Sequence, residues 1–399
     1  MKYLNEVDIK GKRVLCRFDF NVPMDEDSTI ADDRRIRAAL PTINYVLDED
    51  AKLIIAAHLG RPAGKVVERL RLTQVARRLS RLLGREVVLE RDCIGDDIQY
   101  LVNNMTPGSI VFLENLRFHK GETENDNTFA KALARLADVY VDDAFGNAHR
   151  SHASNVGITK YVKECCGGFL MKRELNYFKS SLKKPYRPLV AIVGGSKVSD
   201  KLAALVNLVN VADKVIVGGG MAFTFLKSLG VEVGTSLVDE SLIGMAQKVI
   251  KQVSKSGVKF YLPIDCVIAQ KKSKTAVTKI VPVQEIIPNW MGLDIGPASI
   301  RLFSEVIGNA RTIVWNGPMG VFEIDAFSRG TYAMIHRIAD AQALTIIGGG
   351  DTDVAVYKAG ETDNISYIST GGGAFLDLVE GKKLPAIEAL KKCNKRQRG

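Results

Sequence analysis

The stretch LVAIVGGSKVSDK, residues 189–201, joins a short apolar run to a glycine turn and then to sequence of helical character. Glycine lets backbone N–H groups approach an anion closely, and the helix that follows points the positive end of its dipole at the same place. Ser196 is a candidate N-cap, while Lys197 and Lys201 lie four residues apart on one helix face. Because the glycines precede the lysines, the pattern favours a phosphate-binding turn over a merely solvated lysine face.

The apolar run at 344–347 also ends in glycine, and the run at 215–217 does the same. After the former, Asp351 and Thr352 stand at an expected helix start within GGGDTD. A carboxylate in that position can cap the helix or hold Mg²⁺ on nucleotide phosphates, and the residues alone leave both roles open. No GxxxxGK(S/T) motif occurs in the chain, which excludes the common P-loop.

Two weaker signals lie in the same half of the chain. WNGPMGVFE, residues 315–323, continues an expected strand into a turn, and its Glu323 can bond ribose hydroxyls or simply lie on the surface. TGGGAF, residues 370–375, is another glycine-led helix start whose N–H groups could face a phosphoryl group. Together with the longer turns, they indicate a nucleotide site in the second half.

Short apolar runs alternate with stretches of helical period along the whole chain. This alternation predicts an α/β protein with two doubly wound, Rossmann-like parallel sheets that have helices on both faces. Ligands of such sheets bind at the carboxyl ends of the strands. The expected strands are residues 13–18, 53–57, 109–113, 138–142, 189–193, 214–217, 259–262, 311–315 and 344–347.

The length of 399 residues exceeds what one hydrophobic core usually serves, which favours two domains. Residues 169–182 have helical period without a breaker, and KKPYRP at 183–188 places two prolines before the next strand. We therefore expect a first domain at 1–168, a hinge helix and linker at 169–184, and a second domain at 185–375.

The composition is that of a soluble globular protein, with 46% hydrophobic and 25% charged residues. The amino-terminal sequence lacks the apolar core of a signal peptide, and no uncharged apolar run approaches the roughly 20 residues of a membrane span. These features predict a cytoplasmic protein. The net charge of +10 is shared by both halves and the basic tail at 391–399 is short, so nucleic-acid binding is disfavoured.

The six cysteines are scattered, with no CxxC motif and no histidine at zinc-ligand spacing. This distribution predicts reduced thiols and no zinc site. The adjacent pair Cys165 and Cys166 could form a redox element, but its context favours simple packing, and we assign it no function. The six are Cys16, Cys93, Cys165, Cys166, Cys266 and Cys393.

Basic and polar groups, rather than glycines, follow the expected strands of the first half. In RFDFNVP, residues 17–23, Arg17, Asp19 and Asn21 alternate along an extended segment, so that Asp19 and Asn21 could bind hydroxyls. Arg35 stands at an expected helix start. Because open α/β sheets bind ligands at this edge, the cluster predicts a site for a small anion. The further basic groups just beyond strand ends are His58 and Arg61 in HLGR, Arg117, His149 and Arg150.

Together these segments resemble the phosphoglycerate kinase family, and the resemblance covers essentially the whole chain. Most of the segments are weak signals singly, but their joint occurrence in the family's order is highly specific. They are RFDFNVP, HLGRP, ENLRF, DDAFGNAHR, GGSKVSDK, WNGPMGVFE, GGGDT and TGGGAF.

The resemblance implies reversible phosphoryl transfer between 1,3-bisphosphoglycerate and ADP, which gives 3-phosphoglycerate and ATP with Mg²⁺ as the cofactor. The two substrates would bind to different domains, so that domain closure precedes direct in-line transfer in the interdomain cleft. Residues 376–399 would return to the first domain, and the protein would act as a monomer.

The same resemblance assigns the site residues, position by position. The phosphoglycerate would be bound by Asp19, Phe20, Asn21, Arg35, His58, Leu59, Gly60, Arg61, Arg117 and Arg150. The nucleotide would be bound by Lys201, Glu323, Gly349, Gly350, Asp351 and Thr352, with Asp351 holding Mg²⁺. The groups facing the transferred phosphoryl would be Arg35, Lys197, Gly350 and Gly373.

Two other classes of function are open on the residues alone. A dinucleotide dehydrogenase would share the fold class, but no GxGxxG motif occurs and no acidic ribose partner can be identified, so failure to bind NAD would exclude it. Nucleic-acid binding through the basic tail would be contradicted by binding that survives deletion of residues 391–399 and shows no steep salt dependence.

Overall fold

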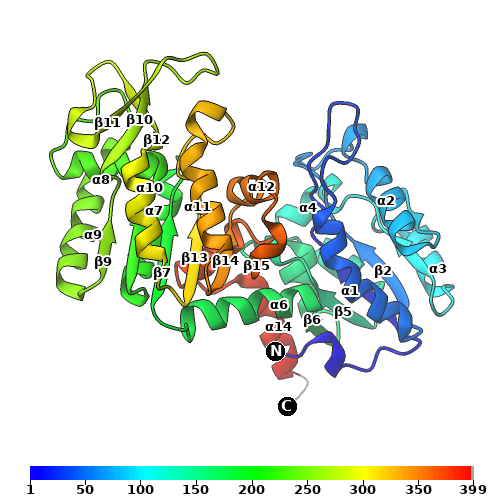
Figure 1. Ribbon diagram of the computed structural model, residues 1–399. Coiled ribbons are helices and arrows are strands. Elements are labelled where there is room, and N and C mark those ends of the chain that lie inside the picture. The colour runs from blue at the N-terminus through cyan, green and yellow to red at the C-terminus, as the bar shows by residue number, and fades with distance from the viewer. Residues whose placement is uncertain (397–399) are drawn as a thin grey trace. The chain divides into compact units, whose positions relative to one another are not determined.

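The computed structural model describes residues 1–396 and, except at position 200, their side chains. The chain forms two compact units (Figure 1). Unit 1 comprises Met1–Leu175 together with the chain from Lys383 onward, and unit 2 comprises Asn176–Lys382. The chain therefore passes between the units twice, once within helix α6 (Phe169–Phe178) and once after residue 382.

Unit 1 is built on a six-stranded sheet in the order β3-β4-β2-β1-β5-β6, in which every neighbouring pair is parallel. Side chains alternate between two cores, because Val14 and Cys16 pack on one face and Leu15 packs on the other. Both faces are buried, as expected of a doubly wound sheet. The strands are β1 (Arg13–Arg17), β2 (Lys52–Ala56), β3 (Val88–Leu89), β4 (Ile110–Phe112), β5 (Val139–Asp142) and β6 (Glu164–Gly167).

Helices supply the other half of each core in unit 1. Ile43 of α1 and Val75 of α2 pack on one face of the sheet, and Phe129 of α5 and Leu390 of α14 pack on the other. The helices are α1 (Arg34–Asp48), α2 (Thr73–Leu83), α3 (Asp96–Asn103), α4 (Lys120–Thr123), α5 (Asn127–Arg135) and α14 (Pro385–Arg396).

Unit 2 repeats the design with a second six-stranded parallel sheet, in the order β15-β14-β13-β7-β8-β9. Its strands are β7 (Leu189–Val193), β8 (Lys214–Val217), β9 (Lys259–Tyr261), β13 (Thr312–Asn316), β14 (Leu344–Gly348) and β15 (Tyr367–Ile368). Its helices are α7 (Val198–Val211), α8 (Gly219–Ser228), α9 (Ile243–Ser256), α10 (Pro297–Ile307), α11 (Arg329–Ala339), α12 (Gly350–Lys358) and α13 (Gly373–Val379).

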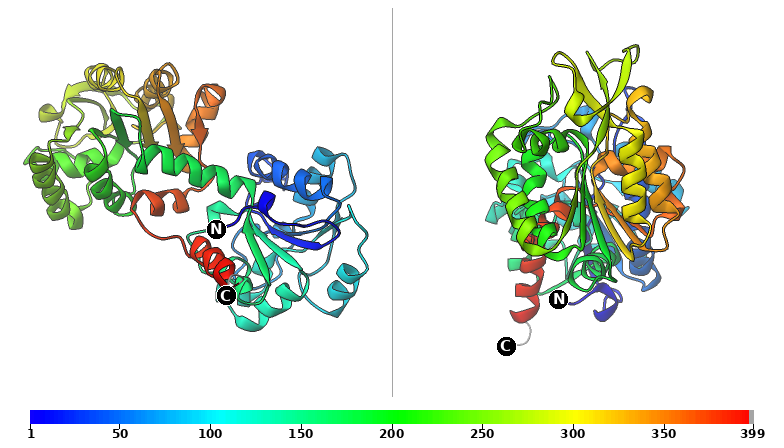
Figure 2. Two further views of the ribbon diagram at one scale, coloured as in Figure 1. Left: turned by 90° about the horizontal axis from the view of Figure 1, so that it is seen from below. Right: turned by 60° about the vertical axis from the view of Figure 1, so that its left-hand side comes forward.

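A three-stranded antiparallel sheet adds a second layer to unit 2. It has the order β11-β10-β12 and consists of β10 (Asp265–Ala269), β11 (Thr278–Pro282) and β12 (Met291–Ile295). Its inner side chains form a core of their own with Phe223 and Leu226 of α8. In Figure 2 this sheet stands at the upper end of unit 2 in the right-hand view.

The predicted α/β class with two parallel sheets is confirmed, and all nine predicted strands occur within one or two residues of their expected bounds. The prediction missed the antiparallel sheet and three edge strands. β3 and β15 have only two residues each, and β6 reads ECCG, which lacks an apolar run. Edge strands of this kind are defined by their pairing partners rather than by their own sequence.

The prediction that all cysteines are reduced is wrong for one pair. Cys165 of β6 and Cys393 of α14 form a disulfide, whereas Cys16, Cys93, Cys166 and Cys266 are buried free thiols. Sequence spacing could not reveal the pair, because the two cysteines are 228 positions apart and only the docking of α14 on β6 brings them together. Among the described residues, no helix is both long and apolar enough to cross a membrane.

Candidate functional site

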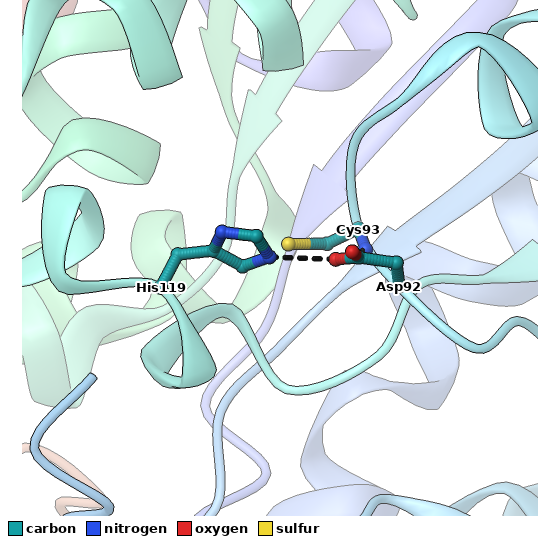
Figure 3. Close-up of side chains that lie close together, drawn as sticks. All are labelled: Asp92, Cys93 and His119. Carbon is teal, nitrogen blue, oxygen red and sulfur yellow. Dashed lines mark hydrogen bonds and ion pairs between the residues drawn. The ribbon is translucent and has the colours of Figure 1, made fainter. Parts of the chain in front are cut away.

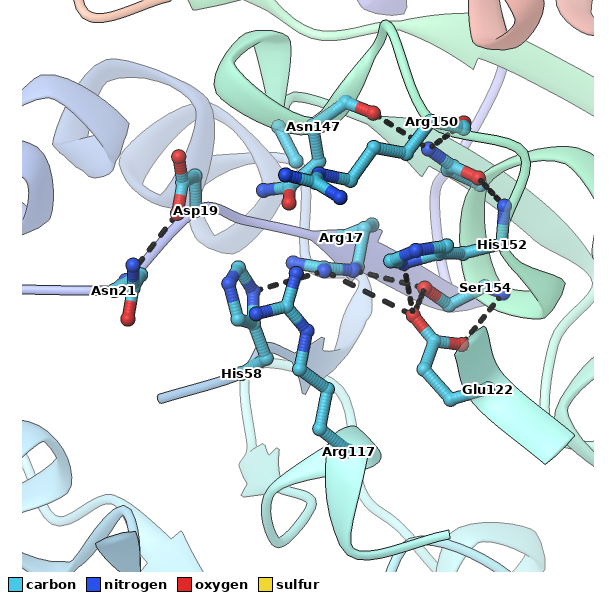
Figure 4. Close-up of polar contacts among 12 residues, drawn as sticks. Arg17, Asp19, Asn21, His58, Arg117, Glu122, Asn147, Arg150, His152 and Ser154 are labelled. Carbon is cyan, nitrogen blue, oxygen red and sulfur yellow. Dashed lines mark hydrogen bonds and ion pairs between the residues drawn. The ribbon is translucent and has the colours of Figure 1, made fainter. Parts of the chain in front are cut away.

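The carboxyl end of the unit 1 sheet holds a buried arginine. Arg17 is the last residue of β1 and is 1% exposed. Its guanidinium donates a hydrogen bond to Ser154 Oγ at 2.9 Å and contacts His58 Nδ1 at 3.1 Å (Figure 4). Because arginine is only a donor, His58 Nδ1 must accept, which leaves the ring proton on Nε2.

Burial and the surrounding arginines hold the pKa of His58 well below its ordinary value. The imidazole is therefore neutral at physiological pH and can donate one hydrogen bond from Nε2. A neutral donor beside several guanidinium groups binds an anion without adding to the repulsion among the arginines.

Glu122 of α4 is the counter-charge behind this arrangement. It is fully buried, lies 4.0 Å from the Arg17 guanidinium and accepts hydrogen bonds from Ser154 N at 2.9 Å and Ser154 Oγ at 2.7 Å. His152 Nδ1 lies 3.5 Å from the same carboxylate. Burial alone would raise the pKa of Glu122, but His152, Arg17 and Ser154 outweigh it, and the pKa lies below its ordinary value.

A second group of contacts joins three loops at the same edge of the sheet. Arg35 of α1 pairs with Asp19 at 2.6 Å, Asn21 Oδ1 accepts a hydrogen bond from Gly60 N at 2.8 Å, and Arg117 Nη1 donates to Gly60 O at 2.8 Å. The segments 17–23 and 58–61 and the turn after β4 are thereby fixed against one another.

The guanidinium of Arg117 lies in an electrostatically unfavourable environment. Burial and the neighbouring charges of Arg17 and Arg150 lower its pKa to about 10. Its Nε atom and Nδ2 of Asn147 are buried donors without a hydrogen-bond partner among the described residues. Crowded cations and unused donors together favour an anionic ligand at this place.

The structure places the other predicted residues of unit 1 at the same edge, but not all with a free side chain. Arg61 and Arg150 are exposed. Phe20 and Leu59 are buried in the core, where the Phe20 ring stacks on Phe18 with 5.3 Å between centroids. Phe20 and Leu59 can therefore offer a ligand only their backbone groups.

Unit 2 contains a cavity of about 370 Å³ at the carboxyl end of its parallel sheet. Part of the lining consists of the glycine turns at the starts of α7 and α8, and the apolar part of the lining includes Leu237, Met291 and Val321. Glu323 and Asp351 also line it, and both are exposed. An apolar lining combined with backbone N–H groups suits a ligand that has a flat ring at one end and phosphates at the other.

The glycines of these turns are needed because backbone packs directly on backbone. A Cβ on Gly194 would lie 2.4 Å from Pro318 O, and a Cβ on Gly219 would lie 2.4 Å from Gly195 N. Gly219 also has a φ of +59°, a region that favours glycine. A side chain at either position would force the turns apart and alter the wall of the cavity.

The two predicted lysines of α7 differ in their surroundings. Lys201 is partly buried, and its ammonium donates to Gly194 O at 2.7 Å, whereas Lys197 is exposed immediately before the helix. The predicted N-cap role of Ser196 is wrong, because α7 begins at Val198 and Lys197 occupies the cap position without a side-chain hydrogen bond.

The predicted residues around α12 and α13 also fall at helix starts. Gly349 precedes α12 with a φ of +101°, Gly350 is the first residue of α12, and Gly373 is the first residue of α13. Asp351 stands exposed in the first turn, but Thr352 is buried and its Oγ1 accepts a hydrogen bond from Gly317 N at 2.8 Å. The Thr352 side chain thus holds the turn after β13, and only its backbone can face a ligand.

A separate cluster in unit 1 joins Asp92, Cys93 and His119, whose ligand-type atoms all lie within 4.8 Å of one another (Figure 3). The sequence has no zinc-ligand spacing, and so it did not predict this cluster. Asp92 Oδ1 accepts hydrogen bonds from the His119 ring at 2.6 Å and from Cys93 N at 2.6 Å, and the Cys93 side chain is buried in the core. These contacts account for the cluster as a brace between two loops.

Several residues of the two sites carried no sequence signal. Glu122, His152 and Ser154 lie outside the motifs at strand ends and reach the site only through tertiary packing. The apolar cavity wall comes partly from β12, a strand that the sequence did not reveal. The partnerless Nδ2 of Asn147 lies within DDAFGNAHR, so this residue could have been considered.

The geometry defines an α/β protein with one site for a small anion and another for a nucleotide-like ligand, each on its own parallel sheet. The family model for phosphoglycerate kinase matches residues 4–382. The phosphoglycerate kinases of Geobacter sp. (strain M21) and Aquifex aeolicus (strain VF5) are 57% and 53% identical to this chain. The Geobacter alignment covers 98% of both chains, and the Aquifex alignment covers 97% of both.

Solved structures agree with this result. The phosphoglycerate kinase of Coxiella burnetii superposes with a TM-score of 0.88 at 41% identity, covering 98% of both chains. That of Pyrococcus horikoshii OT3 gives a TM-score of 0.86 at 30% identity, covering 99% of this chain and 100% of the other. The chain belongs to the phosphoglycerate kinase family. It is an enzyme of glycolysis and gluconeogenesis that transfers a phosphoryl group between 1,3-bisphosphoglycerate and ADP, giving 3-phosphoglycerate and ATP.

Proposed function

We propose that the basic cluster of unit 1 binds the phosphoglycerate and that the cavity of unit 2 binds the nucleotide. The crowding of cations around Arg117, together with its unused Nε donor, supports the first assignment. Asp19, Asn21 and Arg35 bind the hydroxyl and carboxylate end, and Arg61, Arg117 and Arg150 neutralise the phosphate. The neutral His58 donates a hydrogen bond to the phosphate from Nε2. Backbone groups at Phe20, Leu59 and Gly60 complete the site.

In unit 2, the glycine turns bind the nucleotide phosphates and Glu323 bonds the ribose hydroxyls. Lys201, Gly349, Gly350 and Thr352 contribute at the phosphates, Thr352 through its backbone. Asp351 is suited to binding Mg²⁺, because its carboxylate is exposed at a helix start in the lining of the cavity. Hard cations prefer oxygen ligands of this kind. When bound, the ion neutralises phosphate charge and leaves the protein to orient the nucleotide.

The chemistry needs alignment and charge neutralisation more than a nucleophile or general base. A carboxylate acceptor has no proton to lose, so a site built from arginines, a neutral histidine and backbone N–H groups is sufficient. Arg35, Lys197, Gly350 and Gly373 stabilise the transferred phosphoryl. Because the ligands bind to different units, movement about residues 169–184 brings them in line and expels water before transfer.

We further propose that the protein acts in the cytoplasm as a monomer. The two proposed sites lie within one chain, so the reaction requires no second copy. Sedimentation at working concentrations checks the oligomeric state.

Replacement of Asp351 by alanine tests the division of the two sites. Calorimetry should show Mg-nucleotide binding weakened by about tenfold or more, with 3-phosphoglycerate affinity nearly unchanged. Asp353→Ala in the same turn is a matched control, because Asp353 is absent from the cavity lining and should have a smaller effect. Equal losses of both ligands in Asp351→Ala would refute the division.

A further inference from the structure

Helix α14 is the last element of the described chain and docks on unit 1 (Figure 2). It packs against β6 and against two short helical turns, η5 (Ala153–Gly157) and η6 (Ile158–Lys160). Its Leu390 and Cys393 are buried in the same core as Cys165 and Ile158. The helix thus fills one side of the unit 1 sheet next to the segment that carries Ser154.

Polar and covalent contacts tie α14 to this position. Asn394 Nδ2 donates to Cys165 O at 2.6 Å, while Asn394 Oδ1 accepts from Lys2 N at 2.8 Å. One residue before Asn394, Cys393 forms the disulfide with Cys165, with 6.2 Å between the two Cα atoms. At the other end of the helix, Ala386 N donates to Ala148 O at 3.2 Å.

The surface under α14 is also the support of the anion site. Ser154 of η5 bonds both Arg17 and Glu122. Asn155 Nδ2 donates to the carbonyl oxygens of Asn147 and Arg150, each at 3.0 Å, and Ala148 lies between those two residues. A change in the docking of α14 would therefore reach the groups that hold Arg17 and Arg150 in place.

We propose that Cys165 and Cys393 form a thiol–disulfide exchange site, and that the oxidised pair clasps α14 onto unit 1 and keeps the phosphoglycerate site in its binding shape. The effect on binding rests on the role proposed above for unit 1. The existence of the disulfide clasp does not depend on that role. In a reducing cytosol, disulfides of mesophilic proteins are usually transient or redox-sensing, which favours a reversible bond over a permanent one.

A low-molecular-weight disulfide is the oxidant in the exchange reaction. The thiolate of one cysteine attacks a sulfur of oxidised glutathione, releases one glutathione thiolate and leaves a mixed disulfide. The thiolate of the second cysteine then attacks the protein sulfur of the mixed disulfide and displaces the other glutathione thiolate. Two protein protons are given up to solvent or to the two glutathione thiolates. A small dithiol reverses both steps.

Both sulfurs are buried, so exchange requires α14 to open locally. Such opening is confined to the last described helix, whose Lys391, Lys392 and Lys395 are exposed on its outer face. The neighbouring Cys166 does not compete, because it packs in the core on the opposite face of the sheet and burial raises its pKa far above the ordinary value.

Thiol titration of the full-length protein tests the bond. After incubation with oxidised glutathione and removal of the excess, denatured protein should show four reactive thiols, and after dithiothreitol it should show six. Peptide mapping should place the bond between Cys165 and Cys393. Because the bond closes a very long loop, the Tm of the oxidised form should be higher by at least about 5 °C. Six reactive thiols in both samples, or equal Tm values, would overturn the proposal.

Steady-state kinetics test the effect on the site. On reduction, KM for 3-phosphoglycerate should rise at least about twofold while KM for Mg-ATP stays constant. Cys165→Ala and Cys393→Ala should each abolish the response to redox state. Cys166→Ala is the matched control, since it removes an equally buried thiol from the same strand, and it should keep the full response. A response that survives in Cys393→Ala, or that changes both KM values equally, would contradict the coupling.

The two parts of the proposal can fail separately. If calorimetry shows no binding of 3-phosphoglycerate in either redox state, the site assignment of unit 1 is wrong, while the thiol count and the Tm difference still decide whether the clasp exists. If turnover is normal but independent of redox state, the clasp does not act on the site and the regulatory inference is wrong.

Discussion

The anion site of unit 1 and the cavity of unit 2 lie at the same edge of similar sheets, yet they are built from different materials. In unit 1, buried side chains carry full charges, with Arg17 and Glu122 almost entirely inaccessible to solvent. In unit 2, backbone turns at helix starts line the cavity, and glycines such as Gly194 and Gly219 stand where two turns pack backbone against backbone. One site depends on charges and the other on the absence of side chains.

Sites built in these two ways are sensitive to different changes. A buried charge network is costly to assemble, and removal of one partner leaves the other uncompensated. A glycine turn carries only partial charges, so it tolerates charge changes nearby but not a Cβ.

The largest effect is expected at the two cations that we propose to face the transferred phosphoryl group. Arg35→Ala in unit 1 and Lys197→Ala in unit 2 should each lower kcat by ~10³-fold, because each variant loses a cation proposed to stabilise phosphoryl transfer. Both variants should keep the wild-type Tm within a few degrees. Coupled turnover assays measure the effect, and Arg37→Ala is the control for Arg35, since Arg37 is on the same helix and half-exposed. Wild-type kcat in either variant would contradict its role.

The second prediction concerns the buried charges of unit 1. Glu122→Gln should lower the free energy of unfolding of unit 1 by about 3 kcal/mol, because Arg17 is left buried without its counter-charge. KM for 3-phosphoglycerate should rise, and nucleotide affinity should stay the same. Denaturant unfolding and calorimetry measure these quantities. Glu124→Gln, which affects an exposed residue near the same helix, should behave as wild type.

The third prediction is the counterpart in unit 2. Gly219→Ala should destabilise unit 2 by about 2 kcal/mol and weaken nucleotide binding, since the added Cβ meets Gly195 N and the backbone has positive φ. In the control variant Gly244→Ala in α9, the added Cβ has no atom within 4 Å. This variant should leave the stability of unit 2 unchanged or raise it slightly. Should Gly219→Ala bind nucleotide as tightly as wild type, the need for direct backbone packing would be refuted.

The smallest effect is a pH dependence that the two units share. Burial raises the pKa of Asp143 in unit 1 and of Asp294 in unit 2, each to about 7. Each carboxyl accepts a backbone hydrogen bond at a helix start, from Met171 N at 2.9 Å and Gly330 N at 2.7 Å. The two units thus each contain a buried acid, and that of unit 2, Asp294, belongs to the lining of the cavity.

The sign of the pH effect follows from proton binding. The unfolded chain releases these protons near pH 3.8 and the folded chain near pH 7, so stability is full at low pH and falls as the pH rises between these values. For each acid the loss between pH 5 and 7 should be up to about 2 kcal/mol. Asp143→Asn and Asp294→Asn should each flatten this decline in thermal unfolding, and an unchanged slope in both would refute the raised pKa values.

The sequence predicted the elements that have a strong local pattern. Buried parallel strands such as β7 and β13 read as uninterrupted apolar runs, and the turns after them contain glycines that no other residue could replace. Basic residues at strand ends, such as Arg17 and Arg117, were also visible as candidates for an anion site. By contrast, the supports Glu122 and Ser154 were not, because nothing in their neighbourhood distinguishes a buried carboxylate or hydroxyl from a surface one.

The amino-acid sequence by itself determined the α/β class and the family, because these depend on local periodicity and on motifs whose order is specific. The tertiary structure decided which of the predicted site residues have accessible side chains, as the burial of Phe20, Leu59 and Thr352 shows. It also decided the chemical state of Cys165 and Cys393, since a bond between positions 228 residues apart depends on the docking of α14. Contacts of this kind arise from packing between distant segments, which no local pattern encodes.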